Sequence, residues 1–413
     1  MKNNTPSVRQ LAWNSLLRWS QGGIFAETLV SRAAAEHHLS PSDRALLQAI
    51  VYDTLRNMSW LDHMRQVLRP GKLEDKMRWL VLMGLCQMFI LRQPEHAAVS
   101  ETVALAPQRV RGVVNGMLRN AARRRAEFEE ERRRLPLPVQ FSTPSWLVRR
   151  WLKEFGEADT RAMLEWNTQT PPVYARLNPV NPPVDIPAAW EPLPELPLWY
   201  RLSGPLPLEA LRAGQVYVTD PSTRYCVQLL APRPGERVLD ACAAPGGKSA
   251  AMLAATGGDL NLLATDVEEF RLKPLRENLH RAGGRAVQVA QHDWTQPCPA
   301  EWCGGFDAVL LDVPCSNSGV LQRRVDARWR LSAEEMSRLA ALQLSILEQA
   351  CAAVRPGGRL VYSTCSIDRE EDRAVVEAFL ATHKDFSLVE DYLALPHREQ
   401  ADGAYAALLS RSE

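Results

Sequence analysis

The sequence predicts an α/β protein in which a mostly parallel sheet, covered by helices on both faces, is preceded by an all-helical module and a small α+β connecting subdomain. After residue 215, short apolar strands alternate with helical stretches, a pattern typical of parallel sheets. Before residue 136, apolar residues recur at helical spacing and no strand alternation appears. Between these regions, residues 171–207 contain 11 prolines, too many for regular helices but compatible with short strands such as Tyr174–Asn178. We therefore divide the chain into residues 1–135, 136–215 and 216–413.

The helices of the first region begin at recognisable caps. Ser7 is expected to cap the first helix, and Ser40 precedes Pro41, which is an N-cap followed by proline at the first helical position. The stretch Leu73–Leu91 is apolar enough to form the buried centre of a helical bundle. Further helices are expected within Trp60–Leu68, His96–Ala106 and Val110–Leu118.

The net charge of +1 conceals an uneven distribution. Residues 1–135 carry 21 Lys and Arg against 13 Asp and Glu, a net charge of +8, whereas residues 136–413 carry 28 against 35, a net charge of −7. A basic region beside an acidic one is expected of a protein whose first region binds a polyanion. The alternative is that the arginine runs at 123–125 and 132–134, which are interleaved with glutamates, form a solvated helical face.

Composition excludes several classes of protein. The best apolar stretch, Leu80–Leu91, is shorter than the ~18 residues that a membrane-spanning helix needs. The eight cysteines form no C-x-x-C pairs, and His292, Cys298 and Cys303 lack a fourth ligand at a recognised spacing, so neither a disulfide framework nor a metal site is predicted. We expect a cytoplasmic monomer that binds no metal ion and does not associate with a membrane.

The third region supplies the strands of the predicted sheet. A long helix should begin at Ser332, because Ser332 and Glu335 have the spacing of a capping box. The carboxyl ends of parallel strands meet at one edge of a sheet, so polar residues that follow them are expected to surround a ligand. The strand candidates are Arg237–Ala241, Leu262–Asp266, Ala286–Ala290, Asp307–Val313 and Arg359–Ser363, with helices near 247–256, 268–282 and 333–354.

A glycine turn follows the first of these strands. Pro245, Gly246 and Gly247 lead into a helix, so free backbone N–H groups of its first turn can face a ligand. The spacing of a triphosphate loop is not met, because its leading glycine position is Cys242, and the Gly-x-Gly-x-x-Gly dinucleotide pattern is absent. Asp266 ends the next strand ~20 residues on, where it can hold ribose hydroxyls, although capping of the following helix is the alternative. S-adenosyl-L-methionine fits such a site.

Two further strand ends carry Asp312, Cys315 and Cys365. A thiolate that adds to carbon 6 of a pyrimidine makes carbon 5 nucleophilic enough to attack a sulfonium methyl group. A carboxyl group near ring nitrogen 3 stabilises the developing charge, and a base must remove the carbon 5 proton before the thiol leaves. The three residues can take these parts, although a single cysteine after a strand is more often a small buried hydrophobic residue.

Three motifs of this region resemble those of the Nol1/Nop2/Sun family of RNA 5-methylcytosine methyltransferases. They are Asp240–Lys248, Asp312–Ser316 and Tyr362–Ser366, in the family's order and on the expected elements. The resemblance spans roughly Trp146 to the C-terminus and includes Arg176-Leu-Asn178. It implies a Rossmann-like methyltransferase sheet that uses S-adenosyl-L-methionine as cofactor.

The helical region resembles a second family. Its segment Arg111–Arg119 is similar to the RNA-binding domain of the NusB antitermination family. A NusB-like bundle joined to such a methyltransferase domain implies a bacterial enzyme that makes 5-methylcytidine in 16S ribosomal RNA. Transfer RNA or another ribosomal site is the alternative substrate. A non-catalytic RNA-binding assembly factor is the alternative from a different functional class.

The methyltransferase resemblance implies a role for each matching residue. It makes Cys365 the nucleophile and Cys315 the thiol that assists product release, with the reverse order as the alternative. It places Asp293 near the adenine, where an ordinary turn residue is the alternative, and brings Arg271 toward the cofactor, where a surface arginine is the alternative. Asp312 is implied to face the target base as well. The implied cofactor-binding residues are Cys242, Ala243, Ala244, Pro245, Gly246, Gly247, Lys248, Asp266, Asp293 and Asp312.

The sequence also departs from the family pattern. Asn317 and Ser318 replace smaller residues before Gly319, and Asp372 stands where Asn is common. These departures affect the target loop more than the reaction. Lys248 is expected to order neighbouring acidic groups. A basic stretch is predicted either to hold RNA phosphates and stack a base or to form a solvated loop: Arg323, Arg324, Arg328, Trp329 and Arg330.

Overall fold

The computed structural model describes residues 6–183, 185–284 and 286–413. Within it the chain folds into two compact units. Unit 1 extends to Gln169 and includes Leu321–Arg330, and unit 2 comprises Thr170–Val320 and Leu331–Glu413. The three-part division at residues 135 and 215 stays a prediction.

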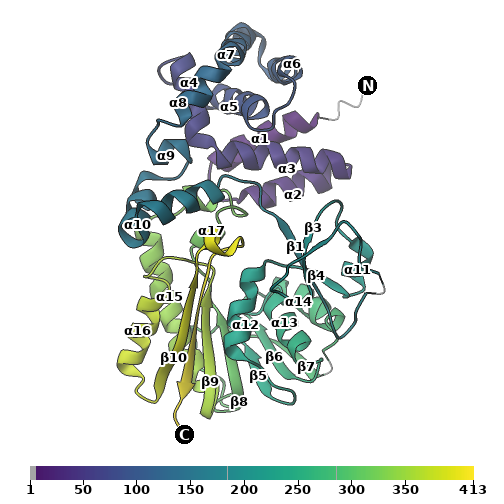
Figure 1. Cartoon of the computed structure of the whole chain (residues 1–413), viewed down its shortest axis with the longest axis vertical. Helices are drawn as coiled ribbons and strands as arrows, with labels where there is room; N and C mark the ends of the chain where they lie inside the picture. Colours follow the sequence, from purple (N-terminus) through teal and green to yellow (C-terminus); the bar gives the residue numbers. More distant parts are fainter. Residues whose placement is uncertain (1–5, 184, 285) are drawn as a thin grey trace. The chain divides into compact units, whose positions relative to one another are not determined.

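Unit 1 is built from helices, as predicted for the first region (Figure 1). The side chain of Ser7 accepts a hydrogen bond from the N–H of Gln10 at 3.2 Å, and that of Ser40 accepts one from Asp43 at 3.1 Å, so both predicted caps are confirmed. Every residue from Trp79 to Phe89 is buried. The helices are α1 (Val8–Ser20), α2 (Ala26–Glu36), α3 (Pro41–Arg56), α4 (Met58–Leu68), α5 (Asp75–Phe89), α6 (Glu95–Leu105), α7 (Arg111–Arg123), α8 (Arg125–Arg132), α9 (Leu137–Gln140) and α10 (Ser145–Trp166).

Helix α2 and the four-residue helix α9 of this unit were not predicted. Helix α2 buries only Ala26, Val30 and Ala34, and no side chain caps its first turn. Small residues and a missing cap leave a weak helical signal in the sequence, so packing against neighbouring helices determines this element.

Several arginines of the basic runs are held by glutamates on α8 and its flanks. Arg124 pairs with Glu127 at 2.5 Å, and Arg133 and Arg134 pair with Glu130 at 2.7 and 2.9 Å. Such exposed pairs one helical turn apart contribute little stability but neutralise charge. For these arginines the interpretation as a solvated helical face is confirmed.

The basic stretch after Val320 lies within unit 1. Arg328 is fully buried and donates hydrogen bonds to the carbonyl oxygens of Asn167 and Leu321 at 3.1 and 2.9 Å, and burial lowers its pKa to about 9. Asp326 is buried too and accepts from the indole N–H of Trp19 at 3.1 Å. Both predictions for Arg328 are therefore wrong, because backbone carbonyls that the sequence cannot reveal satisfy its guanidinium. Other contacts of the stretch join Arg324 to Glu27, Trp329 to the Leu55 carbonyl and Arg330 to the Ile24 carbonyl.

Unit 2 contains a seven-stranded sheet in the order β10-β11-β9-β8-β5-β6-β7. Strands β5 to β9 are parallel, and β10 and β11 add antiparallel pairs at one edge. The predicted mostly parallel sheet is confirmed, and every predicted strand is present. The strands are β5 (Arg237–Asp240), β6 (Asn261–Asp266), β7 (Ala286–Gln291), β8 (Phe306–Asp312), β9 (Val354–Thr364), β10 (Phe386–Ala394) and β11 (Ala404–Arg411).

Helices cover both faces of this sheet (Figure 1). Val238 and Leu310 belong to one apolar core with α12, α13 and α14, whereas Leu239 and Val309 belong to another with α15 and α16. The change of face between adjacent residues follows from the two-residue period of a strand. The helices are α12 (Arg224–Leu230), α13 (Gly247–Ala255), α14 (Glu269–Arg281), α15 (Ala333–Ala350), α16 (Arg373–Thr382) and the short α17 (Pro396–Glu399).

A small four-stranded antiparallel sheet also belongs to unit 2. Its core contains Ala175, Leu177, Trp190 and Val216. The short strand predicted at Tyr174–Asn178 is confirmed. The elements are β1 (Val173–Leu177), β2 (Glu191–Pro192), β3 (Trp199–Leu202), α11 (Leu208–Arg212) and β4 (Val216–Val218). Among the described residues of both units, no helix has the length and apolar character needed to cross a membrane.

Candidate active site

The strand order brings the predicted site loops to one edge of the sheet. Parallel strands β9, β8, β5, β6 and β7 are neighbours in this order, so the loops that follow them lie side by side. The chain runs from β5 to β6 and β7 on one side and places β8 and β9 on the other, which makes the end of β5 a topological switch point. Ligands of open α/β sheets bind at such points. Along this edge the predicted residues follow as Cys365, then Asp312 and Cys315, then Cys242–Lys248, then Asp266, and then Asp293.

The backbone of the turn after β5 requires glycine at position 246, whereas there is open space beside Gly247. Gly246 has φ of 102°, and a Cβ there would lie 3.0 Å from Cδ1 of Leu275. Gly247 begins α13, and a Cβ built on it meets no atom within 4 Å. The side chain of Asn278 donates to the carbonyl of Pro245 at 2.7 Å and holds the turn. The first amides of α13 thus border open space, which fits a ligand over the turn.

Asp266 connects the end of β6 to this turn. Its carboxylate accepts hydrogen bonds from the N–H of Ala244 at 3.2 Å and of Glu268 at 3.1 Å, and it is 4% exposed. Arg271 pairs with the same carboxylate at 3.3 Å and donates to the Ala244 carbonyl at 2.5 Å. Asp266 therefore supports the start of α14 without being its N-cap, which is Glu268. Arg271 lies against the turn and is not an isolated surface arginine.

Asp293, after β7, stabilises a turn. Its Oδ1 accepts from the backbone N–H and the hydroxyl of Thr295 at 2.9 and 2.8 Å. These hydrogen bonds lower the pKa of Asp293. The role of an ordinary turn residue is thus present, and a contact with adenine stays a prediction.

Lys248 and Asp312 form an ion pair between the loops of β5 and β8. Lys248 Nζ lies 2.5 Å from Asp312 Oδ2, and the two side chains are 19% and 30% exposed. Burial opposes the charge of the ammonium, but the Asp312 carboxylate outweighs it and holds the pKa of Lys248 above its usual value. Lys248 orders a neighbouring acidic group, as expected from the sequence.

The two predicted thiols meet at the ends of β8 and β9. Cys315 Sγ and Cys365 Sγ lie 3.0 Å apart, and Cys365 Sγ lies 3.3 Å from Oδ1 of Asn317. The hydrogen bond to Cys365, together with burial, raises the pKa of Cys315 well above its usual value. Cys315 therefore keeps its proton at neutral pH and can donate it in a hydrogen bond to the sulfur of Cys365.

Two buried carboxyl groups lie behind the thiol loops, and the sequence indicated no structural role for either of them. Glu371 Oε1 accepts from the N–H of Ser316 at 2.8 Å, and Asp372 Oδ1 accepts from the hydroxyl of Thr364 at 2.6 Å. Burial raises the pKa of both carboxyl groups. Ser316 follows Cys315, and Thr364 precedes Cys365. A pair of adjacent acids was visible in the sequence, but no spacing rule connects Glu371 to Ser316, which lies 55 residues earlier.

Gly319 joins the same loops through the backbone. Its N–H donates to the Cys365 carbonyl at 3.0 Å, and its carbonyl accepts from Gly403 at 2.8 Å. A Cβ at Gly319 would lie 2.6 Å from the Gly403 oxygen and 2.7 Å from the Cys365 oxygen. Only glycine allows this close approach.

Asp240 is a further buried group at the switch point. One carboxyl oxygen accepts from the hydroxyl of Ser249 at 2.5 Å, and Oδ1 has no hydrogen-bond partner among the described residues. Burial raises the pKa of Asp240 to about 7. Burial also raises the pKa of Cys242, which leaves a neutral thiol in the predicted cofactor loop.

Comparison with known proteins finds matches for most of the chain. The family 16S rRNA methyltransferase RsmB/F matches residues 227–410, and the NusB family matches residues 6–123. Ribosomal RNA small subunit methyltransferase B of Salmonella arizonae is 35% identical over 404 residues, covering 91% of this chain and 92% of that protein. The predicted resemblances to an RNA methyltransferase family and to NusB are confirmed.

Solved structures share the fold. The crystal structure of PH0851 superposes with a TM-score of 0.77 at 22% identity and covers 98% of both chains. NSun6 from Pyrococcus horikoshii with SFG superposes with a TM-score of 0.58 at 18% identity, covering 65% of this chain and 98% of that chain.

Proposed function

The chain belongs to the RsmB/F family of 16S rRNA methyltransferases, and from this premise we propose that it methylates carbon 5 of a cytidine in 16S ribosomal RNA. The observation that carries the proposal is the pair of sulfur atoms of Cys315 and Cys365, which lie 3.0 Å apart. Asp312, at the end of the same strand β8 that precedes Cys315, forms an ion pair with Lys248 after the neighbouring strand β5. Methylation of carbon 5 needs a nucleophile and a second group that assists release, and this pair supplies both. We also propose that the protein acts as a monomer in the cytoplasm.

We propose that S-adenosyl-L-methionine lies over the glycine turn, with Cys242–Lys248 beneath it. The open space at Gly247 and the first amides of α13 suit a ligand there. Asp266 would hold the ribose, and Asp293 would approach the adenine. When bound, the cofactor supplies an electrophilic methyl group. NSun6, which shares the fold, was solved with SFG, an analogue of this cofactor.

In the proposed reaction the thiolate of Cys365 adds to carbon 6 of the cytosine. The electron pair of the carbon 5–carbon 6 double bond shifts to carbon 5, which would attack the sulfonium methyl group. The methyl–sulfur bond would break as the new carbon–carbon bond forms, and the cofactor would leave as S-adenosyl-L-homocysteine. Cys315 keeps its proton because its pKa is raised, and it can stabilise thiolate charge on Cys365 by a hydrogen bond. The choice of Cys365 as the nucleophile and Cys315 as the assisting thiol follows the family resemblance, and the reverse order is the alternative.

Release reverses the addition. The carbon 5 proton passes to a base while the bond between carbon 6 and sulfur breaks, which restores the double bond and the Cys365 thiolate. Cys315 lies within hydrogen-bond distance of the departing sulfur and lowers the cost of its negative charge. Lys248 holds Oδ2 of Asp312, so that Oδ1 can face the pyrimidine ring.

Nucleoside analysis tests the proposed function. The purified protein is incubated with 16S ribosomal RNA and S-adenosyl-L-methionine carrying an isotopic label in its methyl group, and the digested RNA is examined by mass spectrometry. We expect labelled 5-methylcytidine. A label on another nucleoside or another atom would contradict the proposal. A parallel reaction with transfer RNA distinguishes the alternative substrate.

A further inference from the structure

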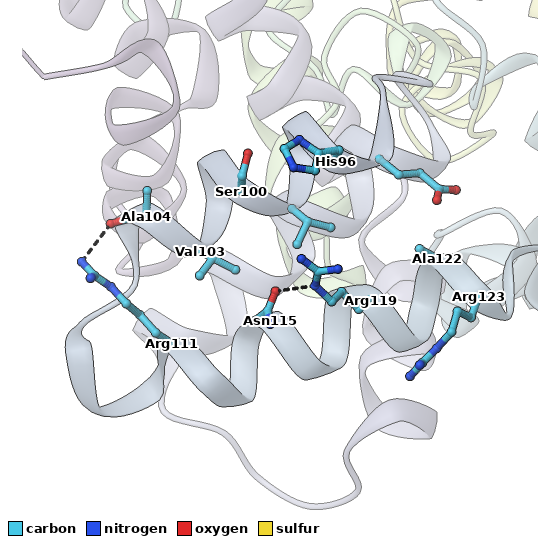
Figure 2. Close-up of a pocket in the computed structure, with 11 residues that line it drawn as sticks. His96, Ser100, Val103, Ala104, Arg111, Asn115, Arg119, Ala122 and Arg123 are labelled. Atoms are coloured by element: carbon cyan, nitrogen blue, oxygen red, sulfur yellow. Dashed lines mark hydrogen bonds between the residues drawn. The ribbon is translucent and has the colours of Figure 1, made fainter.

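A groove runs between α6 and α7 of unit 1, away from the predicted cofactor loops in the sequence (Figure 2). Its volume is about 690 Å³. Val99 and Val103 contribute apolar surface from α6, and Ala122 contributes apolar surface from α7. His96 and Ser100 are exposed on the α6 side. The groove thus combines an apolar floor with a polar rim.

The rim is positively charged. Arg119 reaches from α7 toward α6, and its guanidinium donates to the neutral side chain of Asn115 at 2.9 Å (Figure 2). Arg123 lies one turn further along α7. No carboxylate of the described residues lies within ion-pair distance of either guanidinium. Arg111 stands at the other end of the groove and donates to backbone carbonyls, again without an acidic partner in the described chain.

The groove carries one carboxylate, and that carboxylate is already neutralised. Glu95 is the only acidic residue among those that line it, and it pairs with Arg125 at 3.0 Å. By contrast, Arg133 and Arg134 on the α8 side share Glu130. Arg111, Arg119 and Arg123 therefore bring positive charge without an acidic partner among the described residues to the groove, whereas Arg133 and Arg134 of the second arginine run are neutralised.

We propose that this groove binds a single-stranded segment of RNA. Arg119 and Arg123 would contact successive phosphates, since a guanidinium fork matches phosphate oxygens. A base would lie on the apolar floor between the helices, and the Ser100 hydroxyl and Asn115 amide can hydrogen-bond ribose hydroxyls. The inference rests on the proposed function for its choice of RNA over an acidic peptide.

Neutralising the two arginines tests the groove. The full-length Arg119→Gln/Arg123→Gln variant and the wild type are titrated with fluorescent oligouridylate over a range of salt concentrations. We expect the affinity to fall about tenfold and the slope of log K against log salt to become shallower by about 1.4, because two phosphate contacts on a single strand are lost. The Arg133→Gln/Arg134→Gln variant removes the same charge from the same unit and should change affinity less than about twofold. Equal losses in the two variants would overturn the proposal.

The same variants separate this inference from the proposed reaction. At saturating 16S RNA the groove variant should keep the kcat of the wild type while its KM for RNA rises. If the wild type binds oligouridylate through the groove but makes no 5-methylcytidine, the proposed function fails and the groove stands. If the groove variant loses binding of a polyglutamate peptide and keeps its affinity for oligouridylate, the groove belongs to an acidic peptide and the proposal is overturned.

Discussion

The sulfur atoms of Cys315 and Cys365 lie 3.0 Å apart although 50 residues separate them in the chain. Parallel pairing of β8 with β9, in which Asp312 is opposite Ser363, brings the two loops together. The shared hydrogen bond and burial raise the pKa of Cys315. A protonated thiol beside a second thiol is the arrangement that stabilises a thiolate on the second.

Lys248→Met should lower kcat for RNA methylation about 10–100-fold, because a hydrogen bond to a charged group contributes about 1.5–3 kcal/mol. The change removes the ammonium that holds Oδ2 of Asp312. Initial rates at saturating RNA and cofactor provide the measurement. Lys273→Met, at an exposed position of α14, is the matched control. If both variants keep the wild-type kcat, the ion pair does not orient Asp312 for the reaction.

Glu371→Ala should reduce kcat, because the Ser316 N–H would lose its buried acceptor and the Cys315 loop would shift. Glu371→Gln should restore much of the rate, since its amide oxygen can accept the same hydrogen bond. The carboxylate also raises the pKa of Cys315, so the limb of the pH–rate profile that reports this thiol should move to lower pH in Glu371→Gln. Glu377→Ala, on the exposed side of α16, is the control. A profile identical to that of the wild type would refute the coupling.

Alanine substitution at the two glycines of the turn should affect different properties, stability in one case and cofactor binding in the other. Gly246→Ala should lower the free energy of unfolding by about 1–3 kcal/mol, because a left-handed backbone is strained by a Cβ. Gly247→Ala should leave stability nearly unchanged but weaken the binding of S-adenosyl-L-methionine about tenfold, since its Cβ would occupy the open space over the turn. Thermal unfolding and calorimetric titration separate the two effects. Unchanged cofactor affinity in Gly247→Ala would place the cofactor elsewhere.

Asp240 should make stability depend on pH. Its pKa is about 7 in the folded chain against an ordinary value of 3.8, so its contribution is complete below about pH 4 and is lost as pH rises through about 7. From about pH 5 to pH 7 the wild type should lose roughly 2–3 kcal/mol relative to Asp240→Asn, at 1.36 kcal/mol per pKa unit. Urea unfolding across this range measures the difference, with exposed Asp259→Asn as the control. A difference that does not vary with pH would show that Asp240 is already ionised at pH 5.

Much of the fold could be predicted because local signals agree with it. Ser7 and Ser40 are N-caps, and the apolar strands of residues 237–363 alternate with helices whose ends fall within a few residues of those predicted. Antiparallel β10 and β11 were missed, because β11 pairs with β9 and β10 pairs with β11, and no local sequence signal reveals these pairings.

The sequence predicted which residues follow the strand ends of the site, but it did not predict the hydrogen bonds that connect their loops. Glycine spacing and strand ends identified the turn and the thiols, whereas the family resemblance supplied their roles. Glu371, Asp372 and the contact of Gly319 with Cys365 depend on tertiary packing. Arg328 shows the same limit. Its charge suggested contact with solvent or RNA, but the side chain is buried and donates hydrogen bonds to backbone carbonyl oxygens.

Trapping of the protein–RNA adduct tests whether Cys365 is the nucleophile and Cys315 assists release. Each variant is incubated with 16S ribosomal RNA and S-adenosyl-L-methionine, and a denaturing gel separates free protein from covalent adduct. We predict that Cys315→Ala accumulates the adduct, that Cys365→Ala forms none and transfers no methyl group, and that the double variant resembles Cys365→Ala. Cys303→Ala, which removes an exposed cysteine of the same unit, should behave as the wild type. Adduct formation or full methylation by Cys365→Ala would show that another group attacks carbon 6.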